Sequence, residues 1–521
     1  MASNEISTRS RLLDWTWIAA ASLLLVSVTV LPYWLAYRVP PDHVFTGVLV
    51  NPADGNSYFA KMREGWRGDW FFTLPYTSPP GAGALIFTYY LFLGHLARWT
   101  GASLDLVYAV ARALGGLALL LSAYAFITRF IQERRWQRLA WLLFALGSGL
   151  GWLAVPFGGF TSDLWVAEAI PFLSVFVNAH FALGLALLLW ILIWTTPGLS
   201  SGPTSYWRLA GIALATTVLG QVQPLALLSI GLTLAGILGW VLARRRMSWA
   251  ILLPVVVFGL CAAPWVMYDA LVSRLDPTLA QWNAQNITPS PAVWDMLLSG
   301  GAPLVLAVGG LVVVARRRSD TDVFLMAWLG LGSLALYAPF ALQRRLSLGL
   351  WMPLILLAAI GLRDWIWPRL RGGARPAVII GLAVLVLPSN LLVYFATVAA
   401  VQRRDPAIFM TAPEAAALAW LAEHAAPGAI VAASPQLSLF VPARSDARVV
   451  YGHPFETVDA AAHRQAVEDF YAGHLAATDF VARYNVAFVV LGDRERSLGA
   501  GPSNLGWHPV FADGPVVIDA P

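Results

Sequence analysis

Apolar stretches of about 20 residues recur along most of the chain, and they constrain its fold more than any other feature. Each stretch is long enough to cross the roughly 30 Å of hydrocarbon in a bilayer as an α-helix. Only helices and closed barrels satisfy their backbone polar groups in hydrocarbon, and continuous apolar stretches of this length are typical of helices. Only 12% of the 521 residues are charged, about half the usual share in soluble proteins. The sequence therefore predicts a polytopic α-helical membrane protein.

Arginine clusters predict how these helices are oriented, because short cytoplasmic loops collect Lys and Arg while translocated loops do not. With Arg9 and Arg11 on the cytoplasmic side, the first span at 15–35 ends outside, and no small-residue cleavage site follows it. If the segment 84–100 also spanned the membrane, every later cluster would be inverted. We therefore expect an interfacial helix there, in the first outer loop.

Eleven spans in total then place all four later arginine clusters inside. The ten spans after the first are expected at 104–128, 136–155, 170–194, 206–222, 224–243, 248–268, 300–315, 322–341, 347–366 and 376–400. The clusters are Arg129 to Arg138, Arg244 to Arg246, Arg316 to Arg318 and Arg363 to Arg375. We expect a protein integral to the cell (inner) membrane of a bacterium, with a cytoplasmic N-terminus and an outer C-terminus.

Beyond Arg404 the composition changes, and we expect a separate extracytoplasmic domain at 405–521 after a transmembrane domain at 1–404. Residues 1–404 carry 28 basic and 16 acidic side chains, whereas residues 405–521 carry 6 and 13. Helices are expected at 414–425 and 458–475, and short β-rich runs occur at 429–434, 448–452, 486–492 and 515–519. This alternation predicts a small α/β domain.

Composition and motifs also exclude several classes of function. The C-terminal segment has no Gly-rich phosphate fingerprint, so we assign it no nucleotide. The basic charge of the remaining chain follows membrane orientation, so we expect no nucleic-acid partner. The single cysteine, Cys261, excludes an internal disulfide framework and argues against a cysteine metal site.

The first outer loop contains the sequence NPADGNSYFAKMREGWRGDW at 51–70, with an acidic residue, Asp54, close to the membrane. A carboxylate there could take a proton from a substrate hydroxyl, although first-loop aspartates are often solvated or cap a helix. On a helix, Tyr58 and the only lysine of the chain, Lys61, would share a face with Asp54 and could hold an acceptor or a phosphate.

The second outer loop and the span after it contain further polar candidates. Asp163 and Glu168 are candidate catalytic carboxylates, with an N-cap as the alternative for Asp163. Asn178 and His180 lie just inside the following span and are candidate substrate ligands. A buried histidine that donates to a backbone carbonyl is the structural alternative for His180.

Arg344 and Arg345 fall outside under this topology, against the orientation rule. Guanidinium groups match phosphate oxygens well, so the pair could bind the phosphate of a lipid carrier. Snorkelling to lipid headgroups is the alternative. Gln223, at an outer helix end beside Pro224, could line the same cavity or cap a helix break.

These features resemble the membrane-embedded glycosyltransferases of the C superfamily, which use polyprenyl-phosphate sugars and include protein mannosyltransferases and the aminoarabinose transferase of lipid A. The resemblance rests on the topology and on residues 51–70, 163–181 and 343–345. It implies inverting transfer of a sugar from a polyprenyl-phosphate donor to a lipid, glycan or protein acceptor on the outer face, with Asp54 as general base.

One departure from the family pattern concerns metal use. Many members carry paired acidic residues in the first loop, whereas Gly55 follows Asp54 here. An isolated aspartate suits a metal-independent branch, so we expect no cofactor, and the sequence leaves a divalent metal ion open. Two other functions also remain open: a transporter or flippase for a lipid-linked or small polar substrate, and a non-catalytic membrane scaffold.

Overall fold

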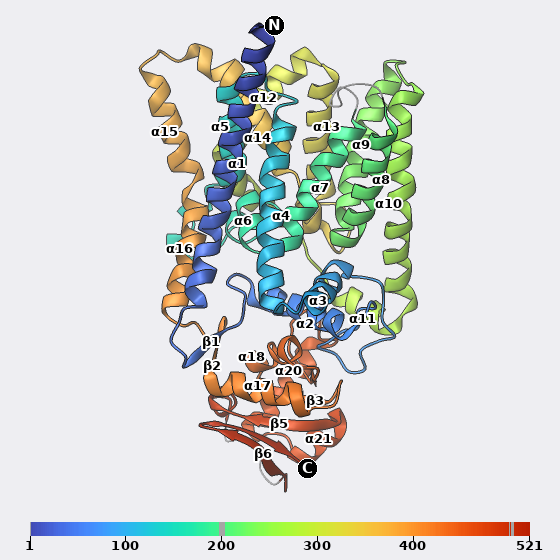
Figure 1. Cartoon of the computed structure of the whole chain (residues 1–521), viewed down its shortest axis with the longest axis vertical. Helices are drawn as coiled ribbons and strands as arrows, with labels where there is room; N and C mark the ends of the chain where they lie inside the picture. Colours follow the sequence, from blue (N-terminus) through green and yellow to red (C-terminus); the bar gives the residue numbers. More distant parts are fainter. Residues whose placement is uncertain (1, 197–203, 500, 502–504) are drawn as a thin grey trace. The chain divides into compact units, whose positions relative to one another are not determined.

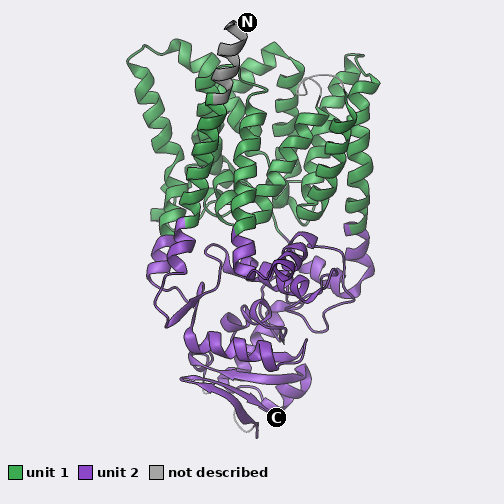
Figure 2. Cartoon of the chain, in the orientation of Figure 1, with its two compact units in different colours: residues 1–30, 110–268, 288–396 green, residues 31–109, 269–287, 397–521 purple. Residues whose placement is uncertain are grey.

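The computed structural model describes residues 2–196, 204–499, 501 and 505–521, with side chains described from residue 13 onward. Arg9 and Arg11, on which the predicted orientation depends, therefore lie outside the described side chains. The chain forms two compact units (Figure 2). Unit 1 comprises residues 1–30, 110–268 and 288–396, and unit 2 comprises residues 31–109, 269–287 and 397–521. Unit 2 thus joins the predicted first outer loop to the C-terminal segment.

Unit 1 is built from helices (Figure 1). Those lying wholly or mainly in it are α1 (Ala2–Ala36), α4 (Leu104–Ile127), α5 (Arg134–Leu146), α6 (Pro171–Phe176), α7 (Ala179–Thr195), α8 (Tyr206–Val222), α9 (Leu225–Ala243), α10 (Trp249–Leu275), α12 (Val293–Arg317), α13 (Asp320–Ala335), α14 (Trp351–Ile360), α15 (Ala374–Val386) and α16 (Pro388–Gln402). Within the described residues, six helices are long and apolar enough to cross a membrane, or up to eight if each of two bent pairs is one span. The protein is therefore an integral membrane protein.

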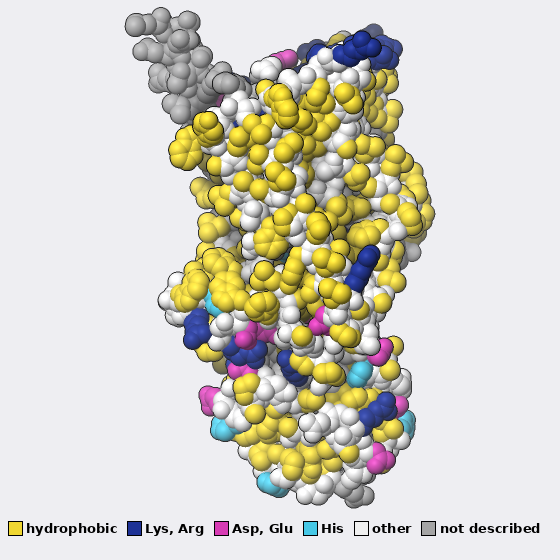
Figure 3. All heavy atoms as spheres, turned by 90° about the vertical axis from the view of Figure 1, so that its right-hand side faces the viewer, with side chains coloured by type: hydrophobic (Ala, Val, Ile, Leu, Met, Phe, Trp, Pro, Cys, Tyr) yellow, Lys and Arg dark blue, Asp and Glu magenta, His cyan; other side chains and the backbone are white. Residues whose placement is uncertain are grey.

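The surface of unit 1 is apolar where its outer helices face away from the helix core. On the part of α10 that lies in unit 1, Trp249 and Leu260 are each at least 70% exposed. Figure 3 shows hydrophobic side chains over much of this side of unit 1. Such a continuous apolar surface is costly in water and is favourable in contact with lipid chains.

The four arginine clusters lie at the same end of the unit 1 helices (Figure 1). Ion pairs connect them: Arg317 contacts Asp364 at 3.4 Å, and Arg246 contacts Asp320 at 2.5 Å. Cationic side chains gathered at one end of a helix bundle are typical of the cytoplasmic face of a membrane protein.

Three predicted spans are broken helices rather than continuous ones. α5 ends at Gly147, α15 and α16 meet at a 44° bend next to Pro388, and α6 and α7 are separated by the extended backbone of Asn178. Glycine and proline interrupt the helical hydrogen-bond ladder, which frees backbone groups that need other partners. Asn390 provides one, because its Nδ2 donates to Leu146 O at 2.9 Å.

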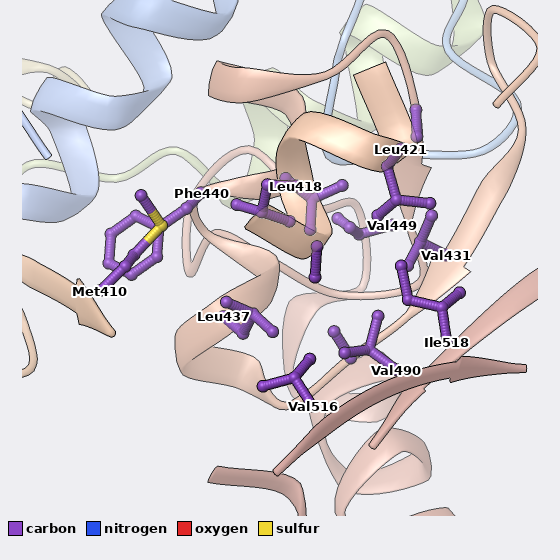
Figure 4. Packing of buried hydrophobic residues seen from close by; sticks show 14 of the residues in the cluster. Met410, Leu418, Leu421, Val431, Leu437, Phe440, Val449, Val490, Val516 and Ile518 are labelled. Carbon is purple, nitrogen blue, oxygen red and sulfur yellow. The ribbon is translucent and has the colours of Figure 1, made fainter. Parts of the chain in front are cut away.

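Unit 2 contains a five-stranded sheet in the order β4-β3-β5-β7-β6. Its strands are β3 (Ile430–Ala432), β4 (Arg448–Val449), β5 (Val486–Leu491), β6 (His508–Asp513) and β7 (Val516–Ala520). β3 is parallel to β4 and β5, whereas β7 is antiparallel to β5 and β6. On this sheet packs α17 (Ala412–His424), whose Leu418 and Leu421 join a buried cluster with Val431, Val490 and Ile518 (Figure 4).

The rest of unit 2 consists of short helices and one strand pair. Its helices outside the sheet are α2 (Pro52–Arg67), α3 (Thr88–Thr100), α11 (Pro277–Gln285), α18 (Pro435–Ser438), α19 (Val441–Arg444), α20 (Ala460–Ala472), α21 (Ala477–Tyr484) and α22 (Asp493–Arg496). The antiparallel strands β1 (His43–Phe45) and β2 (Phe409–Thr411) connect the first outer loop to the C-terminal segment.

The predicted elements of the C-terminal segment correspond closely to the observed ones. β3, β4 and β5 lie inside three predicted runs, β7 overlaps the fourth, and α20 lies inside the predicted helix 458–475. α17 starts two residues earlier than predicted because Thr411 and Glu414 form a capping box. β6 is not predicted, since Pro509 interrupts its pattern, and it forms an edge strand, where proline is tolerated.

Candidate active site

Asp54 lies in the first turn of α2 in unit 2. Asn51 caps this helix: its Oδ1 accepts the backbone N–H of Asp54 at 3.4 Å, and its Nδ2 donates to Asp54 Oδ2 at 2.5 Å. Pro52, in the first turn, has no backbone N–H. The helix loses no hydrogen bond by this, because the N–H groups of a first turn have no acceptor within the helix. The positive end of the helix dipole favours the ionised carboxylate. Because its side chain is 40% exposed, Asp54 is open to a substrate.

A histidine from the C-terminal segment lies beside this carboxylate. His453 is 1% exposed, and its Nε2 is 3.7 Å from Asp54 Oδ1. Its Nδ1 accepts the backbone N–H groups of Phe455 and Glu456, both at 3.0 Å. A ring nitrogen that accepts two hydrogen bonds carries no proton, so the neutral ring holds its proton on Nε2. The N–H of His453 is therefore on the side of Asp54.

Lys61, a predicted phosphate ligand, is completely buried in unit 2. Its Nζ donates to Glu456 Oε1 and to Ser57 Oγ, each at 2.5 Å, and Ser57 Oγ donates to the same Glu456 oxygen at 2.6 Å. Burial alone would raise the pKa of Glu456, but the Lys61 ammonium and these hydrogen bonds outweigh it and lower the pKa. The charge of Lys61 is thus neutralised by a buried ion pair that fixes the C-terminal segment to α2.

Tyr58 packs between Lys61 and α3. Its ring stacks on Tyr90 with 4.3 Å between centroids, and the Lys61 ammonium lies 5.6 Å from the Tyr58 centroid. Phe87 lies closer to the same ammonium, at 4.4 Å. Aromatic faces attract a cation, so these rings add to the stabilisation of the buried charge.

Hydrogen bonds from three side chains hold the segment 452–459, which has the sequence GHPFETVD. Thr457 Oγ1 accepts the N–H groups of residues 452 and 453, and Thr77 Oγ1 accepts that of Val458 at 2.9 Å. Gln285, at the end of α11, donates to Thr457 O at 2.6 Å. At Gly452 a Cβ atom would come within 2.6 Å of the Tyr76 ring, so only glycine fits there. His453 and Glu456 are therefore rigidly positioned.

The buried carboxyl group of Glu64, in α2, should make the stability of the folded protein depend on pH. Burial raises its pKa from 4.5 to about 7, although hydrogen bonds from Thr73 partly offset this. Since the folded state binds this proton more tightly, its contribution to the free energy of unfolding is complete below pH 4.5 and is lost as pH rises through 7. In the wild type, this loss in the free energy of unfolding is on the order of 3 kcal/mol between the two pKa values. We expect it to be absent from the Glu64→Gln variant, because glutamine does not titrate. Thermal unfolding of the wild type and of Glu64→Gln at pH 5 and pH 7.5 checks this. The same change in stability between the two pH values in both proteins would contradict it.

In unit 1, Glu168 and Arg344 form an ion pair. Arg344 Nε donates to Glu168 Oε1 at 3.0 Å, and the Glu168 side chain is 6% exposed. The Arg344 guanidinium also lies 4.7 Å from the centre of the Trp165 ring. A buried carboxylate that pairs with a guanidinium stacked on an indole is held in one orientation. Two candidate residues from separate outer loops are thus in contact.

Arg345 is half-buried next to this pair, in the 3₁₀ segment η4 (Gln343–Ser347). Among the described residues, its guanidinium has no hydrogen-bond or ion-pair partner. Gln343 fixes the segment, because its Oε1 accepts the N–H of Ser290 at 3.0 Å and its Nε2 donates to Ala338 O at 2.9 Å. Arg345 therefore offers an uncompensated positive charge from a rigid support.

Asp163 is fully buried in unit 1 and accepts several hydrogen bonds. Thr161 Oγ1 donates to it at 2.7 Å, the N–H of Gly151 at 3.1 Å and Ser299 Oγ at 3.2 Å. Ser299 Oγ also lies 3.0 Å from Asp295 Oδ1, so the two carboxylates share its single hydroxyl proton. Ile170 holds the N-cap position of α6, the helix that follows, so Asp163 is not the cap of that helix. These contacts position the loops around it.

Asn178, His180 and Gln223 are all buried at helix breaks of unit 1. Asn178 precedes α7 with an extended backbone, and the His180 ring packs on Phe181 with 4.0 Å between centroids. Gln223 ends α8, and Gly184 of α7 leaves room for its side chain. Polar side chains at helix breaks satisfy freed backbone groups or bind ligands.

The structure thus places the predicted site residues in two groups. Asp54, Tyr58 and Lys61 belong to unit 2, and the other seven belong to unit 1. Sequence reasoning did not pair Asp54 with His453 or with Asn51. For Asn51 the signal was present, because Asn directly before Pro is a common helix start. For His453 no local signal exists, since about 400 residues separate it from Asp54 in the chain. Among the described residues, no three His, Cys, Asp or Glu side chains are arranged to hold a metal ion.

No protein-family model and no curated protein sequence matches the chain. Solved structures do match. An oligosaccharyltransferase from Archaeoglobus fulgidus, crystallised with a tethered acceptor peptide, aligns with a TM-score of 0.52 and 13% identity over 91% of this chain and 69% of its own. The arabinofuranosyltransferase AftD from Mycobacteria aligns with a TM-score of 0.54 and 16% identity over 97% of this chain and 39% of its own. The chain therefore shares the fold of these two membrane glycosyltransferases.

Proposed function

We propose that the protein transfers a sugar from a polyprenyl-phosphate-linked donor to an acceptor on the outer face of the membrane, with inversion. The observation that carries this proposal is the exposed carboxylate of Asp54, which Asn51 holds in the first turn of α2. The chain that presents it has the fold of glycosyltransferases. A carboxylate in this position can accept a proton from a hydroxyl group.

The proposed reaction proceeds in one displacement. The acceptor oxygen attacks the anomeric carbon while its proton passes to Asp54. The bond between that carbon and the phosphate oxygen breaks, and its electrons stay on the departing polyprenyl phosphate. In unit 1, Arg344 and Arg345 offer guanidinium groups that suit such a phosphate. Glu168 orients Arg344 through their ion pair, and Asp163 organises the loops nearby.

The proposed topology has eleven spans. Three helices of 16 or 17 residues, α7, α8 and α13, join the six long helices and two bent pairs as spans. Together these give eleven spans, with the three shorter helices at the lower limit of the length that crosses the hydrocarbon, roughly 17 residues. We propose a cytoplasmic N-terminus in the cell membrane, and residues 405–521 as an extracytoplasmic domain that follows the transmembrane domain at 1–404.

The test follows undecaprenyl phosphate, because the proposed reaction releases it whichever sugar and acceptor are used. The full-length protein in nanodiscs is mixed with undecaprenyl-phosphate-linked hexoses and pentoses and with envelope extract as the acceptor source. Release of free undecaprenyl phosphate is followed by mass spectrometry. Release with at least one donor, dependent on the extract, supports the proposal. No release with any donor contradicts it.

A transporter remains the second candidate because unit 1 contains broken helices. α6 and α7 meet at Asn178, and α8 and α9 meet at Gln223 and Pro224. Interrupted helices with buried polar residues line the substrate sites of many transporters. The same experiment separates the two functions, since a transporter moves its substrate without releasing undecaprenyl phosphate.

The positive charge of Arg345 should strengthen the binding of undecaprenyl phosphate, the lipid product of the proposed reaction. Arg345→Gln removes a positive charge that has no partner in the described structure, and we expect affinity for undecaprenyl phosphate to fall about tenfold or more. Native mass spectrometry of the protein with undecaprenyl phosphate measures this. Arg371→Gln is the control, because Arg371 is exposed and belongs to an arginine cluster at the other end of the helices. Equal affinities in the two variants would exclude Arg345 from the phosphate site.

A further inference from the structure

Segment 452–459 contains two buried polar atoms whose hydrogen-bonding capacity is unused. His453 Nε2 and Glu456 Oε2 have no hydrogen-bond partner within the described residues. Both side chains are otherwise fully engaged: Nδ1 of His453 accepts two backbone N–H groups, and Oε1 of Glu456 binds Lys61 and Ser57. A buried polar atom without a partner costs free energy, so such atoms often mark the place of a ligand.

The position of His453 Nε2 shows which ligand group would fit. It lies 3.7 Å from Asp54 Oδ1, which is too long for a direct hydrogen bond. An oxygen atom at about 2.8 Å from both atoms, a usual hydrogen-bond length, bridges this distance. Nε2 carries a proton and a carboxylate can only accept, so an oxygen between them accepts from one and donates to the other. A hydroxyl group does both.

We propose that His453 is a substrate-binding residue whose Nε2–H donates to the acceptor hydroxyl oxygen while Asp54 accepts the proton of that hydroxyl. This inference rests on the proposed function and deepens it. The hydroxyl proton passes to Asp54, His453 keeps its own, and the free lone pair of the oxygen forms the bond to the anomeric carbon. Two fixed hydrogen bonds orient that lone pair, which is the form of catalysis that positioning supplies.

The rigid support of His453 favours this role over that of a moving lid or a partner surface. Thr457, Thr77 and Gln285 hold the segment through backbone hydrogen bonds, and the Glu456–Lys61 pair anchors it to α2. A lid needs freedom to open, which these contacts remove. A donor that must hold one geometry benefits from them.

Two substitutions separate the functions of the two ring nitrogens. Asparagine at position 453 places an oxygen near the site of Nδ1, so His453→Asn keeps the acceptor for the backbone N–H groups and loses the Nε2 donor. Glutamine reaches the site of Nε2 with an N–H, so His453→Gln keeps the donor and loses that acceptor. The control is His474→Asn, because His474 also lies near an aspartate, 3.6 Å from Asp469, but is 74% exposed.

The experiment measures undecaprenyl phosphate release by the full-length protein in nanodiscs, with the donor that the wild type uses. We expect His453→Asn to lower kcat about 10- to 100-fold with unchanged affinity for undecaprenyl phosphate, and His453→Gln to retain more activity than His453→Asn. His474→Asn should match the wild type. The reverse order of the two His453 variants would indicate a purely structural role and overturn the inference.

The two proposals fail in different ways. If the wild type releases undecaprenyl phosphate and His453→Asn is equally active, the inference fails and the proposed function stands. If the wild type releases none with any donor, the proposed function fails and takes the inference with it. Selective ¹⁵N labelling of histidine in the full-length protein gives an independent reading. A proton on Nδ1 rather than Nε2 of His453 would overturn the inference without any turnover.

Discussion

Replacing Asp54 with asparagine is expected to lower the rate of sugar transfer about 10²- to 10⁴-fold, the range typical for loss of a general base. The substitution removes the charge and the basicity but keeps the shape. The amide oxygen of asparagine can still accept the hydrogen bond from Asn51, and the backbone N–H of residue 54 still reaches the Asn51 side chain. Release of undecaprenyl phosphate in nanodiscs measures the effect, together with the thermal unfolding midpoint as a check of folding.

A matched control separates chemistry from helix stability. Asp479 also lies in the first turn of a helix, α21, and is exposed, so Asp479→Asn loses the same favourable interaction with the helix dipole. That loss is worth about 0.3–1 kcal/mol in stability and should leave transfer unchanged. If Asp54→Asn retained full activity, Asp54 would not be the base, and substrate movement without covalent change would favour the transporter.

Hydropathy predicts most of the fold because membrane helices are local in sequence. The segment 84–100, expected to form an interfacial helix, contains α3, and the apolar spans coincide with helices of unit 1. The predicted spans miss the breaks at Asn178 and Pro388, because a window of about 20 residues averages over one polar or cyclic residue. The break at Asn178 depends on tertiary contacts that hydropathy does not contain.

The candidate site was predictable only in part, and the reason is again distance in sequence. The charge of Arg344, unusual for an outer loop, indicated a special role, but the sequence did not predict its ion pair with Glu168, which lies 176 residues earlier. For Lys61 the helical spacing suggested a substrate ligand, whereas the ammonium is buried against Glu456, 395 residues later. Helical periodicity gives the face of a residue but not which partner covers that face.

The Lys61–Glu456 ion pair is expected to control the stability of unit 2 more than any other pair discussed above. Lys61→Met leaves the Glu456 carboxylate buried without its countercharge, and we expect a loss of about 3–5 kcal/mol in the free energy of unfolding. The double variant Lys61→Met with Glu456→Gln removes both charges and should recover much of that loss. Arg464→Met, which breaks an exposed pair with Glu468, should cost less than about 1 kcal/mol.

The pH dependence of these variants gives a second, independent reading. In the wild type the pKa of Glu456 is lowered, so its stabilising contribution is present at neutral pH and is lost as pH falls through the folded pKa. Without the Lys61 ammonium, burial dominates and raises that pKa, so Lys61→Met should become more stable as pH falls toward 5. Thermal unfolding between pH 5 and pH 8, with proteolysis within residues 405–521 as a local probe, measures both effects. A Lys61→Met variant with the stability and pH profile of the wild type would show that the ion pair does not hold the C-terminal segment on α2.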